Sequence, residues 1–362
     1  MSKILVINPG STSTKLSLFD DETEIETIDI FHDSSILKEF KTINDQLDYR
    51  MAVVYDFLNK HHIDKLDAIA SRGGASYSVE GGTYEVDDLL IEDTKAAKGG
   101  LYHSSMLGVQ MAKVTSERFG GHIYMSNPTV TDEYEELSRV TGIDGIYRKS
   151  ICHALNQKAV AQRFAEDTGN KYEDLRLIVA HIDGGITVMA HKYGRMIDGN
   201  DGGGGDGPLT PTRMGSMAIS DVINYLWDKP KDEMLKLISV SGGFSNYFGT
   251  SNSDIIHDMV LKGDKKAKRV YEAMIYQTGK CIGAMSIALE GQVAAIILTG
   301  GLLRFKDIYE SIQRYCGWIA KIYVYPGEYE QYSLAHNAYL ALNQKIEVKH
   351  YCGKPVFDGF ND

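Results

Sequence analysis

The chain has 362 residues, 43% of them hydrophobic and 24% charged, so it is long enough for two domains with large apolar cores. A net charge of −11 without a basic patch argues against a nucleic-acid partner, and no apolar run approaches the length of a membrane span. Four scattered cysteines and an N-terminus without signal-peptide features favour a soluble protein with free thiols in the cytoplasm.

The first predicted elements form a hairpin with a polar tip. Short apolar runs at Ile4–Ile7 and Leu16–Phe19 indicate strands, and a third strand follows near Glu24–Phe31. The tip offers backbone N–H groups, the small hydroxyls of residues 11–14 and the amine of Lys15, which suit a polyphosphate. An ordinary polar turn is the alternative, and for this motif alone it is the commoner outcome.

An arginine follows the next predicted strand. A helical pattern covers Gln46–His62, and the strand Leu66–Ala70 leads to Arg72 and two glycines. Arginine at the carboxyl end of a strand, with glycines clearing space, suits a carboxylate or phosphate ligand. A surface arginine beside a turn is the alternative, and these residues alone do not choose between the two.

Two histidines stand at the starts of predicted helices. His103 precedes the helical run Ser105–Phe119, and His153 stands near the start of an amphipathic helix over Ile151–Phe164. A lone histidine in this position is more often a cap or packing residue than a catalyst. The positive end of a helix keeps such a histidine neutral unless an anion is near.

The hairpin pattern returns in the second half of the chain. Leu177–His181 is a second apolar strand, followed by a glycine turn and by strands at Ile186–His191 and Arg195–Asp198. A third relative is the strand Ala294–Leu298 with its Thr-Gly-Gly turn at 299–301. Two like halves with such turns predict two domains facing each other across a nucleotide cleft.

A glycine-rich stretch precedes a second candidate arginine. Residues 199–207 contain four consecutive glycines, and Arg213 follows shortly after. We expect a mobile loop beside a cleft, with a plain linker as the alternative. The remaining expected elements are helices at 216–227, 231–238, 265–290, 306–315 and 330–344, a strand at 319–325, a loop at 241–250 and an irregular tail at 346–362.

Several motifs, taken in order, resemble those of the butyrate kinases. They are INPGSTSTKLSLFD, SRGG, GGTYEV, RKSICHALNQKAVA, AHIDGGITVMAHKYGRMID, GPLTPTR, LTGG and YPGE, which span about residues 3–342. Butyrate kinases belong with the acetate and propionate kinases, inside the fold of sugar kinases, heat-shock chaperones and actin. The resemblance implies two similar α/β domains, 1–148 and 149–329, each a mixed sheet flanked by helices, with a cleft between them. It also implies a last helix, about 330–345, that packs on the first domain, and a homodimer.

The resemblance implies phosphoryl transfer between ATP and a short-chain carboxylate, giving ADP and an acyl phosphate, with Mg²⁺. Arg72 would hold the carboxylate, and His153 and Arg213 would stabilise the transition state. Asn8 and Glu330 would position Mg²⁺, mostly through waters. The residues implied to contact ATP are Asn8, Ser11, Ser13, Lys15, His181, Asp183, Gly184, Gly185, Gly300 and Gly301. Those implied near the acid are Arg72, Gly74, Tyr102, His103 and Cys152.

The chain departs from the family pattern at several positions. Asn127 replaces a catalytic-site aspartate, Asp183 stands in a glycine-rich phosphate loop, no arginine follows Gly249, and a His-Asn pair at 336–337 replaces small or apolar residues. Small side chains at Gly74 and Cys152 predict an acyl pocket wider than that of an acetate kinase. Two alternatives remain: a kinase with another small acceptor, and a degenerate relative that binds nucleotide or acyl phosphate in a regulatory role.

Overall fold

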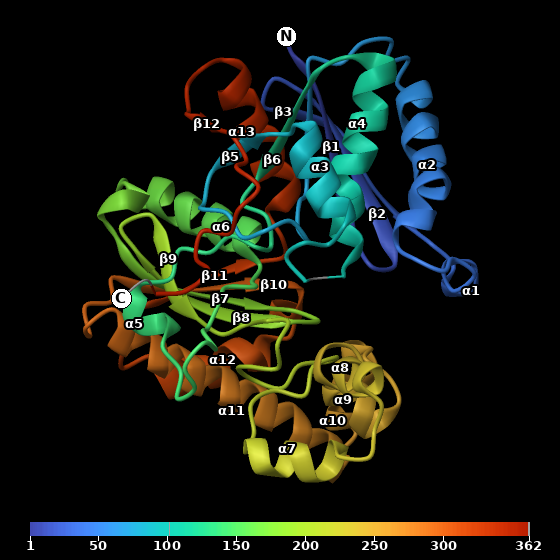
Figure 1. The fold of residues 1–362 in the computed structure, drawn as a ribbon. Helices are drawn as coiled ribbons and strands as arrows, with labels where there is room; N and C mark the ends of the chain where they lie inside the picture. The colour runs from blue at the N-terminus through green and yellow to red at the C-terminus, as the bar shows by residue number, and fades with distance from the viewer. Residues whose placement is uncertain (101, 361–362) are drawn as a thin grey trace. The chain divides into compact units, whose positions relative to one another are not determined.

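The computed structural model describes residues 1–100 and 102–360, and contacts within the chain divide it into two units (Figure 1). Unit 1 comprises Met1–Asp132 and Tyr329–Asp362, and unit 2 comprises Glu133–Glu328. Both combine a mixed β-sheet with helices, which confirms the predicted α/β class. In the described residues, no helix combines the length and apolar character needed to cross a lipid bilayer.

Unit 1 is built on a seven-stranded sheet in the order β12-β5-β6-β4-β1-β2-β3. The strands are β1 (Lys3–Pro9), β2 (Ser13–Asp20), β3 (Thr23–Phe31), β4 (Ala68–Ser71), β5 (Thr83–Glu85), β6 (His122–Ser126) and β12 (Val348–Lys349). β1 pairs antiparallel with β2 and parallel with β4, which itself pairs parallel with β6. The carboxyl ends of β1, β4 and β6 therefore meet at one edge, where ligands bind in open α/β sheets.

The α-helices of unit 1 are α1 (Ser34–Leu37), α2 (Leu47–Lys60), α3 (Asp88–Lys95), α4 (Leu107–Phe119) and α13 (Glu330–Leu342). Both α4 and α13 pack on β1, β4 and β6, so the central strands are buried and read as continuous apolar runs. The last helix thus contacts the first strands of the chain. The tail is more ordered than expected, because β12 pairs with β5.

Unit 2 contains a five-stranded sheet in the order β11-β10-β7-β8-β9. Its strands are β7 (Arg176–Ile182), β8 (Ile186–Lys192), β9 (Arg195–Gly199), β10 (Ala295–Gly300) and β11 (Ile322–Pro326). β7, β10 and β11 are parallel, whereas β7, β8 and β9 form an antiparallel meander. The turns after β7, β10 and β11 consequently lie at the same edge of the sheet.

The helices of unit 2 follow the expected order with three additions, α5 (Glu136–Arg139), α9 (Gly243–Phe248) and α10 (Ser253–Leu261). The other α-helices are α6 (Ala154–Asp167), α7 (Ile219–Leu226), α8 (Lys231–Ser239), α11 (Lys265–Ala288) and α12 (Lys306–Cys316). The loop expected at 241–250 contains α9, so that prediction is wrong. Gly243 makes this helix possible, because its φ is 56° and an added Cβ would lie 1.7 Å from Thr210 O.

The boundary between the units falls earlier in the chain than 148/149. Glu133 accepts hydrogen bonds from Lys158 Nζ at 3.0 Å and Met196 N at 2.8 Å. Tyr134 Oη donates to Gly199 O at 2.9 Å. These contacts attach the segment that starts at residue 133 to α6 and β9 of unit 2.

Candidate active-site residues in two units

The β1–β2 turn of unit 1 is shaped by a buried arginine. Arg50, on α2, donates to Ser13 O at 2.8 Å, to Thr14 Oγ1 at 3.0 Å and to Ser11 O at 3.4 Å. Its side chain is fully buried, and burial lowers the pKa of the guanidinium to about 10. The sequence reasoning missed Arg50. Its helical spacing to Val54 and Phe57, which places it on the apolar face of α2, was the available signal.

The polar side chains of this turn lie in three different environments. Ser11 Oγ is 3.2 Å from Nε2 of His103, whose Nδ1 accepts from Ser105 N at 3.1 Å. His103 therefore caps the helical turn that begins at Ser104, as a lone histidine there often does. Lys15 Nζ lies 3.9 Å from Asp29 Oδ2 on β3. Ser13 contributes its backbone carbonyl to Arg50, and the structure brings Ser11 and His103 together directly.

Arg72, Asn8 and Glu330 form a buried polar cluster in unit 1. Arg72 Nη1 donates to Glu330 Oε2 at 3.2 Å and to Asn8 Oδ1 at 3.4 Å, and Asn8 Nδ2 donates to the same Glu330 oxygen at 2.8 Å. Within residues 1–100 and 102–360, Arg72 Nε is buried without a hydrogen-bond partner. A buried unpaired donor costs about 1–3 kcal/mol, so this nitrogen is suited to an anionic ligand.

The residues of this cluster can be compared with the ligands that Mg²⁺ prefers. The amide oxygen of Asn8 and the carboxylate of Glu330 are hard oxygen ligands of the kind that Mg²⁺ prefers. Both oxygens, however, contact Arg72 Nη1, which occupies the place of a directly bound cation. A hydrated Mg²⁺ held through water molecules would leave these contacts in place, and the metal role of Asn8 and Glu330 stays a prediction.

Three other candidates of unit 1 have distinct surroundings. A Cβ on Gly74 would lie 2.5 Å from Thr129 Oγ1 and 2.9 Å from Ser105 Oγ, so only glycine fits there. Asn127 has a φ of 42° and its Oδ1 accepts from Gly82 N at 2.8 Å, a structural role that an asparagine fills well. Tyr102 is 75% exposed.

In unit 2, two histidines stack on each other. The rings of His153 and His181 lie 3.9 Å apart and 14° from parallel. His153 is the N-cap residue of α6, and its Nδ1 is 2.9 Å from Thr187 Oγ1. Since Gln157 donates to that hydroxyl at 2.9 Å, the hydroxyl proton can point to His153 Nδ1. With the hydroxyl donating in this way, His153 would carry its proton on Nε2, where it can donate to an anionic oxygen.

Arg213 is partly buried beside the glycine turn that follows β7. In the described part of the chain, its Nε and Nη1 are buried without hydrogen-bond partners. Burial lowers the pKa of its guanidinium, and Asp201 opposes that shift. A Cβ on Gly185 would lie 2.0 Å from Nη1, so the glycine makes room for the arginine. Thr210, another residue missed from sequence, donates to Gly184 O at 2.8 Å and thereby joins the Arg213 segment to this turn.

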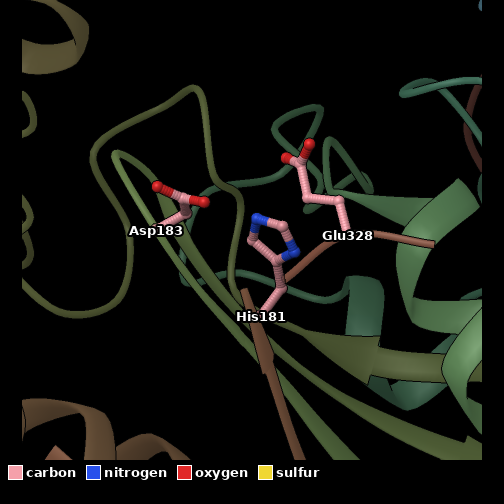
Figure 2. A group of neighbouring side chains, drawn as sticks. All are labelled: His181, Asp183 and Glu328. Atoms are coloured by element: carbon pink, nitrogen blue, oxygen red, sulfur yellow. The ribbon is translucent and has the colours of Figure 1, made fainter. Parts of the chain in front are cut away.

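Asp183 connects the turns after β7 and β10. Its Oδ1 accepts from Gly184 N and its Oδ2 accepts from Gly301 N, both at 2.8 Å. Gly300 has a φ of 106°, and a Cβ there would lie 2.4 Å from Ile182 O, so this turn requires glycine. The carboxylate lies close to His181 and Glu328, and Figure 2 shows the three side chains converging.

Cys152 does not lie with these groups. It is buried in a small apolar cluster with Tyr134, Met189 and Met196. Its small size therefore shapes the packing within unit 2. In sum, the structure brings Asn8, Arg72 and Glu330 together in unit 1. In unit 2 it gathers His153, His181, Asp183, Gly184, Gly185, Arg213, Gly300 and Gly301 around neighbouring turns.

Known structures share this fold. A propionate kinase from Francisella tularensis subsp. tularensis SCHU S4 is 18% identical, with a TM-score of 0.73 over 93% of this chain and 99% of that one. An acetate kinase from Porphyromonas gingivalis is also 18% identical, with a TM-score of 0.74 over the same shares. A ROK hexokinase from Thermus thermophilus is 13% identical, with a TM-score of 0.50 over 94% of this chain and 99% of that one.

The family model of the acetokinase family matches residues 124–304. The match covers half of the chain and includes His153, the turn after β7, Arg213 and the turn after β10. This family comprises carboxylate kinases, which use ATP to convert a carboxylate to an acyl phosphate. The chain described here belongs to the acetokinase family.

Proposed function

We propose that this protein transfers the γ-phosphoryl group of ATP to and from a short-chain carboxylate, butyrate or a branched-chain acid, to form an acyl phosphate. The observation that carries the proposal is the environment of the Arg213 guanidinium. Two of its guanidinium nitrogens are buried and, among the described residues, have no hydrogen-bond partner. Such nitrogens are best satisfied by anionic oxygens of a ligand.

The reaction needs little acid–base chemistry from the protein. A carboxylate oxygen attacks the γ-phosphorus, a new P–O bond forms, and the bond to the bridging oxygen breaks as ADP departs with the electron pair. The carboxylate is already deprotonated, so no general base is needed. The protein must align the reactants and neutralise the equatorial oxygens of the phosphoryl group. Arg213 and the Nε2–H of His153 supply a cation and a donor for this purpose.

Unit 1 offers residues for the acid and the metal. Arg72, with its buried Nε, has the charge and geometry to hold a carboxylate or acyl phosphate. A hydrated Mg²⁺ near Asn8 and Glu330 would neutralise phosphate charge through its waters. The turns at 183–185 and 300–301 are assigned to the nucleotide, and the Ser11–Lys15 segment is assigned to its phosphates.

The choice of butyrate or a branched acid rests on the resemblance of the motifs and on Gly74. No larger residue fits at position 74, because Thr129 and Ser105 already lie where its Cβ would be. One methylene changes binding in an apolar pocket by only about 1–3 kcal/mol, so a graded preference among neighbouring acids is expected. We also propose a homodimer, which light scattering during gel filtration tests directly.

The proposal is tested by trapping acyl phosphate as the hydroxamate, with ATP, Mg²⁺ and acids of two to six carbons. Wild type is expected to turn over best with four-carbon or branched acids, and Arg213→Ala to lose about 10²- to 10³-fold in kcat. Arg213→Lys keeps the charge but loses the planar fork, so it should recover only part of the rate. If no acid is turned over although ATP still binds, the kinase proposal fails, and a different acceptor or a regulatory nucleotide-binding role takes its place.

A further inference from the structure

Three metal-binding side chains of unit 2 meet at the edge where β7, β10 and β11 end. His181 is at the end of β7, Asp183 is in the turn that follows, and Glu328 comes two residues after β11. One ligand atom from each lies within 4.8 Å of the others. Figure 2 shows a ring nitrogen of His181 facing the space between the two carboxylates.

Asp183 is the member whose position needs an explanation. Both of its oxygens accept backbone N–H groups, from Gly184 and Gly301, so the side chain is fixed at the turn. In residues 1–100 and 102–360, it forms no ion pair with a lysine or an arginine. A fixed carboxylate beside a turn assigned to nucleotide phosphates would repel them.

A divalent cation removes this conflict, because it attracts the carboxylates and the phosphates together. We propose that His181, Asp183 and Glu328 form a divalent-cation site that belongs to unit 2 and binds the cation directly. The role of the cation toward phosphate rests on the proposed function, whereas the ligand set stands on geometry alone. This site is separate from the Asn8–Glu330 cluster of unit 1, where Arg72 leaves room only for a hydrated ion.

Asn156 supports the histidine of this site. Its amide nitrogen lies 2.9 Å from His181 Nδ1 and 3.1 Å from Thr299 Oγ1. Ligation through His181 Nε2 leaves the proton on Nδ1, so the Asn156 amide must turn and present its oxygen to that N–H. Asn156→Leu is therefore expected to weaken cation binding about 10- to 100-fold without removing a ligand.

The test is a titration of the full-length protein with Mn²⁺, followed by the EPR signal of free Mn²⁺, in the absence of ATP and acid. Asp183→Asn and Glu328→Gln should each weaken the site at least about tenfold. Glu328 is exposed, so its variant is expected to fold normally, and thermal melting of both variants checks this. Glu310→Gln, at an exposed carboxylate on α12, is the matched control and should bind Mn²⁺ as wild type does.

A second readout identifies the histidine. Pulsed EPR of the bound Mn²⁺ should show coupling to a nitrogen nucleus that disappears in His181→Gln. Loss of Mn²⁺ binding in Glu330→Gln, with full binding in Asp183→Asn and Glu328→Gln, would place the cation in unit 1 and overturn the inference. Unchanged Mn²⁺ affinity in those two variants overturns it as well.

The binding data also separate this inference from the proposed function. If wild type forms acyl phosphate but the Asp183 and Glu328 variants bind Mn²⁺ normally, the site fails and the kinase proposal stands. If Mn²⁺ binds as expected but no acid is phosphorylated, the site stands and the kinase proposal fails.

Discussion

Gly185→Ala should separate the position of Arg213 from the stability of the fold. The new Cβ would lie 2.0 Å from Nη1, 2.4 Å from Cζ and 2.7 Å from Nη2 of Arg213. Restoring ordinary contact at 3.4 Å moves Nη1 by about 1.4 Å. The atoms that must move form the far end of a flexible side chain, so the backbone of the turn can stay in place.

A displacement of this size is enough to abolish the contribution of the arginine. Misplacing a catalytic group by 1 Å can cost about 100-fold in rate, and losing one oxyanion-stabilising donor costs about 2.7–4 kcal/mol. We therefore expect kcat for acyl phosphate formation to fall about 10²- to 10³-fold in Gly185→Ala. The melting temperature should fall by less than about 4 °C, since the cost of moving an arginine tip is about 1 kcal/mol or less.

Three further variants make the test specific. Gly283→Ala, on α11, places its Cβ in open space and should keep full activity with equal or higher stability. Gly184→Ala also meets open space, so it should lose far less than its neighbour. In the double variant Gly185→Ala/Arg213→Ala, the rate should match that of Arg213→Ala alone, because both changes remove the same contact. A Gly185→Ala enzyme within tenfold of wild type would refute the reasoning.

Three other predictions concern unit 1. Arg50→Met fills the same space but removes the hydrogen bonds that Arg50 donates to Ser13 O and to the buried Thr14 Oγ1, so urea denaturation should show a loss of about 1–3 kcal/mol. Burial, followed by the charge of Arg50, lowers the pKa of His32 from 6.5 to about 4. The unfolded chain therefore binds more protons between these values, and stability should fall as pH drops from about 6.5 toward 4. His32→Gln should show a shallower decline in parallel denaturation curves, and an identical slope contradicts the assignment. Gly74→Ala should cost about 1–3 kcal/mol by overpacking against Thr129, and Thr129→Ala should recover part of that loss in melting experiments.

Local sequence patterns were sufficient for the strands and turns that carry the candidate site, but not for β12 in the tail. The apolar runs of β1 and β7 are each followed by residues that typically end a strand. The hydrophobic pattern and the turn residues therefore predict the same strand end. Arg213 was proposed from its motif, and the structure adds a physical argument for that proposal, because its Nε and Nη1 are buried without hydrogen-bond partners among the described residues.

The sequence could not show which residues far apart in the chain contact each other. Arg50 contacts a turn that lies 36 to 39 residues away, and no local pattern encodes that choice. The hydrogen bond from Gly301 N to the Asp183 carboxylate joins residues 118 apart. The sequence therefore showed an acidic residue in a predicted phosphate loop, but not the backbone group that fixes its carboxylate. The helix α9 was missed because six residues with three aromatic side chains and a glycine carry almost no periodicity.

The division of unit 1 between the two ends of the chain affects the order in which the protein can be made. All of unit 2 is synthesised before Tyr329 emerges, so its sheet can complete while β1, β4 and β6 still lack the helix that covers them. Glu330 arrives with that helix, and until then Arg72 has no carboxylate beside it. A nascent or prematurely terminated chain could therefore contain a finished second unit and yet be unable to assemble the Arg72 cluster. The Arg72 cluster can therefore form only near the end of translation.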